Sequence, residues 1–135
     1  MVKLIIGLKG SGKTKTLIDL ANAAIPNSEA PVVVITKGPA LMHQIKWAAR
    51  LINVDDYDID SSRSLYGMLA GISATNHDIH EIFIDGIIRI ACHEPEIYER
   101  LILSIAKLAE KNNMNVYITL SKTVEELPDS LHAFV

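Results

Sequence analysis

The sequence predicts an α/β fold in three layers, in which a mainly parallel sheet of four or five strands carries helices on both faces. Short, continuously apolar runs such as Val32–Ile35 alternate along the chain with longer segments of helical periodicity. Strands that alternate with helices form a parallel sheet covered by helices. The length of 135 residues and the hydrophobic content of 49% suit a single domain, residues 1–135, with its own core.

The sequence pattern of the N-terminal half predicts two strands and two helices. Leu4–Ile6 has the composition of a short buried strand, and the helix expected at Lys13–Ala24 ends before Pro26. Val32–Ile35 is β-branched and apolar throughout, as buried parallel strands are. Pro39 suits the first turn of a second helix. The apolar face expected for that helix consists of Leu41, Ile45, Ala48 and Ile52.

The C-terminal half continues the alternation after a polar loop at residues 55–62. Two helices are expected, and each carries an apolar stripe. The stripes consist of Leu65, Leu69 and Ile72 in the first helix and of Ile97, Leu101, Ile105 and Leu108 in the second. Glu81–Asp85 and Val116–Leu120 are the third and fourth strands, and His132–Val135 is a candidate for a fifth strand at an edge.

A glycine-rich loop joins the first strand to the first helix. Residues 7–14, Gly-Leu-Lys-Gly-Ser-Gly-Lys-Thr, match the phosphate-binding pattern G-x-x-x-x-G-K-[ST]. Backbone N–H groups of such a loop surround phosphates, aided by the positive end of the following helix. Lys13 is expected to reach the outer phosphates, and the Thr14 hydroxyl to join the shell of Mg²⁺. The pattern predicts a P-loop NTPase fold with Walker A contacts from Gly7, Lys9, Gly10, Ser11, Gly12, Lys13, Thr14 and Lys15.

The end of the third strand supplies the expected second part of the site. The apolar run Ile82–Ile84 followed by Asp85 is typical of a Walker B motif, so Thr14 and Asp85 are the expected metal ligands. Ligands of parallel sheets lie beyond the carboxyl ends of the strands. At that end of the sheet, Thr119 is either a sensor of the γ-phosphate or a hydroxyl that only makes hydrogen bonds within the chain. The segments within reach of a ligand are residues 7–14, Thr36 and Lys37, Asp85 and Gly86, and Thr119–Lys122, and the expected catalytic residues are Lys13, Asp85 and Thr119.

The residues after Asp85 narrow the kind of NTPase. Gly86, Ile87 and Ile88 do not complete the D-x-x-G of GTPases, and no guanine-reading [NT]-K-x-D is present, which favours ATP. Gly86 also stands where many ATPases have a water-orienting glutamate, so we expect a slow Mg²⁺-dependent ATP hydrolase. A nucleotide-responsive binding module and a small-molecule phosphotransferase stay open as alternatives. The segment Ile87–Cys92 is either a buried helix or a contact surface that offers Arg89 to a neighbouring subunit.

Three parts of the chain resemble a known group of proteins. They are the opening Met1–Lys15 and the blocks Tyr57–Ile59 and Ile82–Asp85. They look like the corresponding parts of small stand-alone bacterial P-loop ATP-binding proteins, which are often labelled twitching-motility ATPases. The resemblance implies ATP binding on a RecA-like or thymidine-kinase-like core, and it implies no particular reaction.

Composition limits the partners and the compartment. The net charge of −3 with scattered Lys and Arg argues against nucleic acid as the main partner, whereas a homo-oligomer or a protein partner stays open. The single Cys92 suits a reducing cytoplasm, and no apolar stretch is long enough for membrane insertion. Trp47 is expected in the core or on partly covered surface. Gly67 and Gly71 are expected to let their helix pack closely on the sheet.

Overall fold

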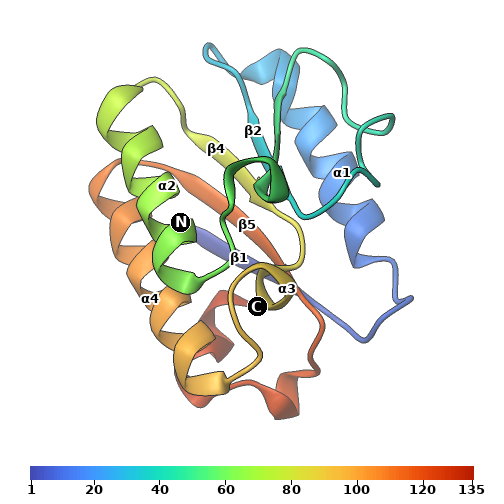
Figure 1. Cartoon of the computed structure of the whole chain (residues 1–135), viewed down its shortest axis with the longest axis vertical. Coiled ribbons are helices and arrows are strands. Elements are labelled where there is room, and N and C mark those ends of the chain that lie inside the picture. Colours follow the sequence, from blue (N-terminus) through green and yellow to red (C-terminus); the bar gives the residue numbers. More distant parts are fainter.

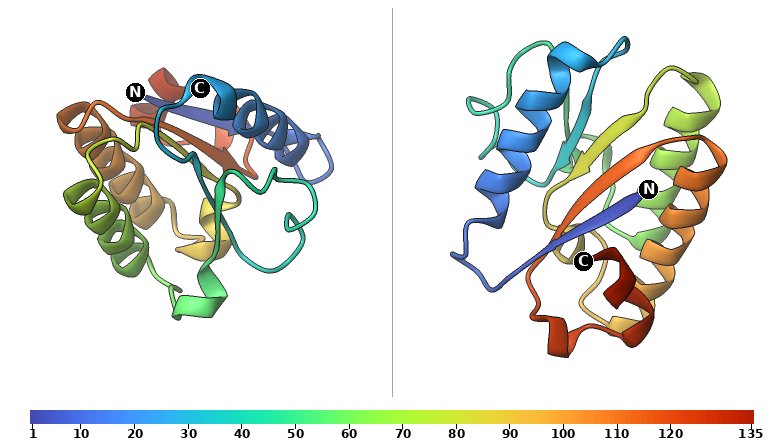
Figure 2. Two further views of the ribbon diagram at one scale, coloured as in Figure 1. Left: turned by 90° about the horizontal axis from the view of Figure 1, so that it is seen from above. Right: turned by 180° about the vertical axis from the view of Figure 1, so that it is seen from behind.

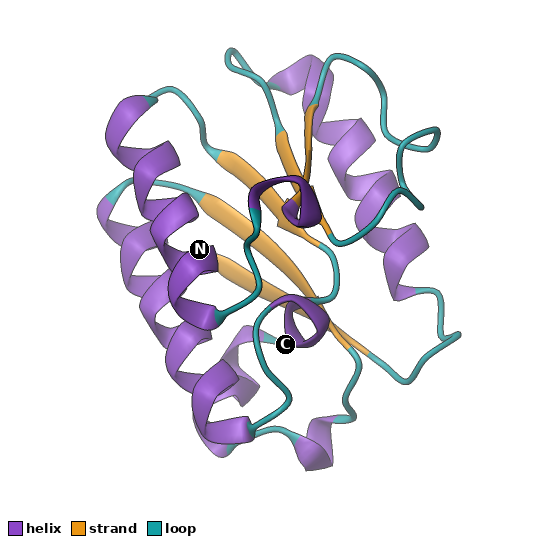
Figure 3. Ribbon diagram, viewed as in Figure 1, coloured by secondary structure: helices purple, strands orange, loops and turns teal.

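The computed structural model describes all 135 residues and contains one five-stranded sheet in which every pair of neighbours is parallel (Figures 1 and 3). The strand order is β1-β5-β4-β2-β3, so β5 lies between β1 and β4. The strands are β1 (Val2–Ile6), β2 (Val33–Thr36), β3 (Arg50–Asn53), β4 (Glu81–Ile84) and β5 (Asn115–Leu120). The predicted α/β fold with a parallel sheet is therefore confirmed.

Helices cover both faces of the sheet (Figure 2). Helix α1 (Lys13–Ala24) packs on one face, and α2 (Ser62–Thr75) and α4 (Pro95–Lys111) pack on the other. The short helix α3 (Ile87–Ile90) follows β4. Turns of 3₁₀ helix lie at Ile25–Asn27, Val54–Tyr57, Val124–Glu126 and Asp129–Phe134. No helix is long and apolar enough to cross a membrane.

The side chains of each strand alternate between two hydrophobic cores. In β2, Val34 belongs to the core under α1, whereas Val33 and Ile35 belong to the larger core under α2 and α4. Phe83 of β4 joins Val34 in the α1 core and stacks on Tyr117 of β5 with ring centroids 4.6 Å apart. Successive side chains of a strand point to opposite faces of the sheet. The position two residues after Val34 or Phe83 therefore lies on the α1 side again.

The helix expected from Pro39 is wrong. Residues 39–49 form a series of turns, and Arg50–Asn53 is the edge strand β3, which pairs with β2. Leu41 and Ile45 are buried in the α1 core as their spacing suggested, but Ile52 packs against the opposite core. The helical spacing was misleading because strand β2 offered an unpaired edge, and pairing with it satisfies the backbone of residues 50–53.

Three smaller expectations are also wrong. His132–Val135 forms no strand, because Asp129–Phe134 is a 3₁₀ turn that buries Leu131 beside α4 and β1. Trp47 is 96% exposed. Gly67 and Gly71 lie on the outer side of α2, where an added Cβ would meet no atom within 4 Å, so they do not mediate close packing on the sheet.

Candidate functional site

The glycine-rich loop leaves the carboxyl end of β1 and turns directly into α1 (Figure 1). The Gly7 N–H donates to the Lys122 carbonyl over 3.1 Å, and the Ser11 N–H donates to the Leu8 carbonyl over 3.0 Å. A Cβ on residue 7 would collide with the Ser11 side chain, and φ there is +152°, so glycine is strongly favoured at this close approach. The backbone of the loop is therefore folded into a tight turn.

The first turn of α1 is open to an anion. Gly12, with φ of +90°, occupies the N-cap position and supplies no side-chain cap, and the first turn contains no acidic residue. The partial positive charge of this helix end is therefore uncompensated. Lys13 adds a full charge, since its Nζ contacts only the Leu8 carbonyl, at 3.5 Å. Lys15 points elsewhere and pairs with Asp19 over 3.0 Å on the exposed side of the helix.

Asp85 follows β4 and is only 4% exposed. Its Oδ1 accepts hydrogen bonds from Thr14 Oγ1 at 3.1 Å and from Thr119 Oγ1 at 2.9 Å. Thr119 Oγ1 in turn accepts from the Gly86 N–H at 2.7 Å. The fold thus brings together the three predicted residues Thr14, Asp85 and Thr119, from α1, the end of β4 and the end of β5.

The other oxygen of Asp85 faces Arg89. The Arg89 Nη2 lies 3.6 Å from Asp85 Oδ2, and the arginine side chain is 57% exposed. Gly86 has φ of +77°, and a Cβ there would lie 2.8 Å from Arg89 Nε. A glutamate at position 86 would therefore be strained by this backbone conformation and would displace the Arg89 side chain. Ile87, Ile88 and Ile90 are buried, so of the two expectations for this segment the buried helix is confirmed.

A row of polar side chains crosses the sheet at its carboxyl end. Thr36 and Asn53 are register partners on β2 and β3, and the Asp85 N–H donates to the Ile35 carbonyl over 2.9 Å. Asp85 also lies beside Thr119, as their hydrogen bond shows. Partners in register share a face of the sheet, here the α1 face. The row therefore runs in the order Thr119, Asp85, Thr36, Asn53.

Sequence reasoning missed Asn53, because it assigned residues 39–52 to a helix. Strand β3 is only four residues long, and its sequence Arg-Leu-Ile-Asn does not alternate between polar and apolar residues, so it carries no clear local signal. Lys37 was expected within reach of a ligand, but its Nζ pairs with Asp55 Oδ1 at 2.6 Å. Glu81 lies at the opposite end of the sheet, where it accepts from Asn115 Nδ2 at 3.0 Å.

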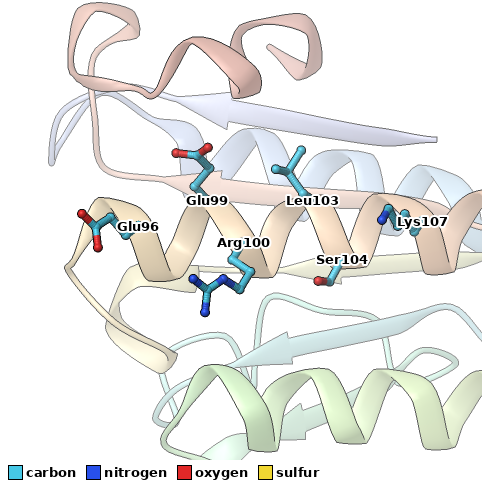
Figure 4. A pocket seen from close by; sticks show the side chains of 6 residues that line it. All are labelled: Glu96, Glu99, Arg100, Leu103, Ser104 and Lys107. Atoms are coloured by element: carbon cyan, nitrogen blue, oxygen red, sulfur yellow. The ribbon is translucent and has the colours of Figure 1, made fainter.

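A hollow of about 470 Å³ runs along the outside of α4 (Figure 4). Its six lining residues all come from that one helix, and only Leu103 among them is apolar. The side chains of Glu96, Glu99, Arg100 and Lys107 project outward from the ribbon without converging on a common point. This surface therefore lacks the convergent polar groups of a binding site, unlike the end of the sheet at Asp85.

No protein-family model matches this chain, and a search of the curated proteins finds no relative.

Proposed function

We propose that this chain is a P-loop NTPase of three-layer architecture that binds ATP with Mg²⁺ and hydrolyses it slowly. The observation that carries the proposal is the contact of the Thr14 hydroxyl with the buried carboxylate of Asp85 at the mouth of the glycine-rich loop. This contact brings two oxygen atoms suited to the proposed metal beside the glycine-rich loop. The same features support membership in the group of small bacterial P-loop ATP-binding proteins.

The loop and α1 account for phosphate binding in this proposal. The free N–H groups of the first turn of α1 and the positive end of the helix attract anions. Lys13 adds a point charge for the outer phosphates, and only one weak contact has to be given up when it moves. The contacts are assigned to Gly7, Lys9, Gly10, Ser11, Gly12, Lys13, Thr14 and Lys15, in the last case through the backbone because the Lys15 ammonium pairs with Asp19.

Thr14 and Asp85 are the residues that would hold Mg²⁺. Both offer oxygen atoms, which hard cations prefer, and Asp85 Oδ2 accepts no hydrogen bond in the chain. When bound, the ion neutralises charge on the β- and γ-phosphates. Thr119 keeps Asp85 oriented by donating a hydrogen bond to its Oδ1.

The slow turnover in this proposal follows from Gly86, the residue directly after Asp85. Phosphoryl transfer to water depends on a group that orients the attacking water and on cations that stabilise charge. Gly86 supplies no such group, and its left-handed backbone, with φ of +77°, disfavours any side chain at this position. The residues assigned to the site are therefore suited to binding the nucleotide rather than to activating water.

A small-molecule phosphotransferase is the second candidate. The observation that favours it is the polar row, which continues from Asp85 through Thr36 to Asn53 and ends at a cavity. A second molecule bound at that end of the row would lie on the same edge of the sheet as the proposed phosphate site.

The proposal is tested by calorimetric titration of ATP in Mg²⁺ into the wild type and into Lys13→Ala. Loss of the lysine should weaken binding about 10- to 100-fold, as removal of a charge-assisted hydrogen bond does. Lys107→Ala, which removes an exposed lysine on α4, is the matched control and should bind as the wild type does. Equal affinities of the wild type and Lys13→Ala would contradict the assignment of the loop.

A further inference from the structure

A second cavity lies at the carboxyl ends of β2 and β3, on the α1 face of the sheet. Its volume is about 420 Å³, within the range of small-molecule sites. Thr36, Leu51 and Asn53 line it from the strands, and Met42 and Trp47 line it from the turns at residues 39–49. Its position agrees with the rule that ligands of parallel sheets bind beyond the carboxyl ends of the strands.

Two polar groups at the floor of this cavity have no partner in the chain. Thr36 is 2% exposed, and its hydroxyl makes no hydrogen bond. The Asn53 carbonyl oxygen accepts from the Gly38 and Asp55 N–H groups at 2.9 and 3.1 Å, which leaves its Nδ2 without an acceptor. Asn53 is half-buried at the end of β3, whereas Thr36 is almost fully enclosed, so the Thr36 hydroxyl and the Asn53 Nδ2 are both available to a ligand in the cavity.

The mouth of the cavity carries large apolar side chains in contact with solvent. Trp47 is 96% exposed and Met42 is 56% exposed. The turns that present them are fastened to α1, because Asn22 donates to the Gln44 carbonyl and accepts from the Lys46 N–H, both at 3.0 Å. The cavity is therefore held in shape by the fold, with an aromatic ring available for stacking at its edge.

The charge around the cavity is balanced. Lys46 and Asp56 also line it, and neither side chain forms an ion pair. One positive and one negative rim charge favour neither an anion nor a cation, whereas the floor offers one amide donor and one hydroxyl. A flat, neutral ring with an acceptor beside a donor, as in a lactam, matches all of these groups.

We infer that this cavity binds a small neutral heteroaromatic molecule with an amide-like edge. Asn53 Nδ2 donates to its carbonyl oxygen, Thr36 Oγ1 accepts from its ring N–H, and Trp47 stacks on its face. The site is separate from the proposed phosphate loop but shares the polar row with it, since Thr36 is the neighbour of Asp85 across the β2–β4 pair. The inference does not depend on nucleotide binding.

The test uses the sole tryptophan as a reporter. 2-Quinolone, a flat neutral lactam, is titrated into the ¹⁵N-labelled protein in the absence of nucleotide and Mg²⁺, and the indole N–H signal of Trp47 is followed by NMR. We expect saturable shifts of this signal and of the Asn53 side-chain amide. N-Methyl-2-quinolone, which lacks the donor, should bind about 3- to 10-fold more weakly, as loss of one hydrogen bond predicts.

Two variants locate the binding. Thr36→Val keeps the shape of the side chain and removes the hydroxyl, so affinity for 2-quinolone should fall about 3- to 10-fold while the preference over the N-methyl compound disappears. Tyr57→Ala removes another exposed aromatic ring, which lies outside the cavity, and should leave affinity unchanged. Folding of each variant is checked by its NMR spectrum.

Several outcomes would overturn the inference. They are an indole signal that does not move up to the solubility limit of 2-quinolone, shifts that scatter over the surface, and equal affinity of the wild type and Thr36→Val. Signals of residues 39–49 that broaden with protein concentration alone would instead assign the surface to contact between copies of the chain. Because no nucleotide is present, failure of ATP binding would not affect any of these results.

Discussion

The Thr14 hydroxyl donates a hydrogen bond to Asp85 Oδ1 over 3.1 Å and thereby joins the first turn of α1 to the end of β4, 71 residues later in the chain. Thr119 binds the same oxygen from β5, the strand between β1 and β4. Asp85 is therefore both a structural acceptor and the proposed metal ligand. A variant that tests the metal role has to preserve its structural role.

Asp85→Asn meets that requirement, because its amide oxygen can still accept from Thr14 and Thr119. We expect ATP affinity to fall about 10- to 100-fold in Mg²⁺ and to change little in a chelator, since only the charge that the metal needs is lost. Fluorescence titration with an ATP analogue in both buffers measures the difference. A loss of equal size in both buffers would mean that Asp85 is only structural.

Bound nucleotide should stabilise the folded chain, because the loop that binds it exists only in the native state. At an ATP concentration about 100-fold above Kd, the free energy of unfolding should rise by about 2.7 kcal/mol. Thermal melting with Mg-ATP, ADP and GTP measures this effect, with ATP favoured over GTP. A melting temperature that none of the three changes at millimolar concentration would refute nucleotide binding.

The isolated chain should hydrolyse ATP at less than about 1 s⁻¹, the low end of ordinary enzyme turnover. The reason is the absence of a water-orienting group at Gly86, whose left-handed backbone conformation disfavours a side chain. Phosphate release is measured over a wide range of protein concentration. Fast turnover independent of concentration would contradict the proposal, whereas turnover that rises with concentration would indicate a group supplied by a second copy.

Tyr98 offers a test of the core that is independent of the nucleotide. Its ring is fully buried on α4, and its hydroxyl has no hydrogen-bond partner. Tyr98→Phe removes this unsatisfied group, so the free energy of unfolding in urea should rise by about 1 kcal/mol at neutral pH. A clear loss of stability in Tyr98→Phe would mean that a water or another group satisfies the hydroxyl.

The difference in stability between the wild type and Tyr98→Phe should change with pH in a defined direction. Burial, with the nearby charges of Glu126 and Glu99, raises the pKa of Tyr98 above the ordinary value of 10.0. Above that pH the unfolded chain loses its tyrosine proton before the folded chain does, so the wild type loses stability as the pH rises. Tyr98→Phe lacks this contribution, and its advantage over the wild type should therefore widen above pH 10.

Local patterns determine the glycine-rich loop, helix α1 and the strands that end at Ile84 and Leu120. These elements are predictable because glycine spacing, helical periodicity and continuous apolar runs are properties of neighbouring residues. The same patterns indicate Lys13, Thr14 and Asp85 as candidate site residues. The rule that ligands lie beyond the carboxyl ends of strands also pointed correctly to Thr119 and Thr36 as neighbours of the site.

Only the tertiary structure decided which carboxyl ends of the strands lie side by side. The order β1-β5-β4-β2-β3 places Thr119 and Thr36 on either side of Asp85, and no local pattern encodes that order. The free edge of β2 turned residues 50–53 into a strand and so brought Asn53 next to Thr36. A strand of four residues is stabilised by its partner and not by its own propensity, which is why the sequence by itself predicted a helix there.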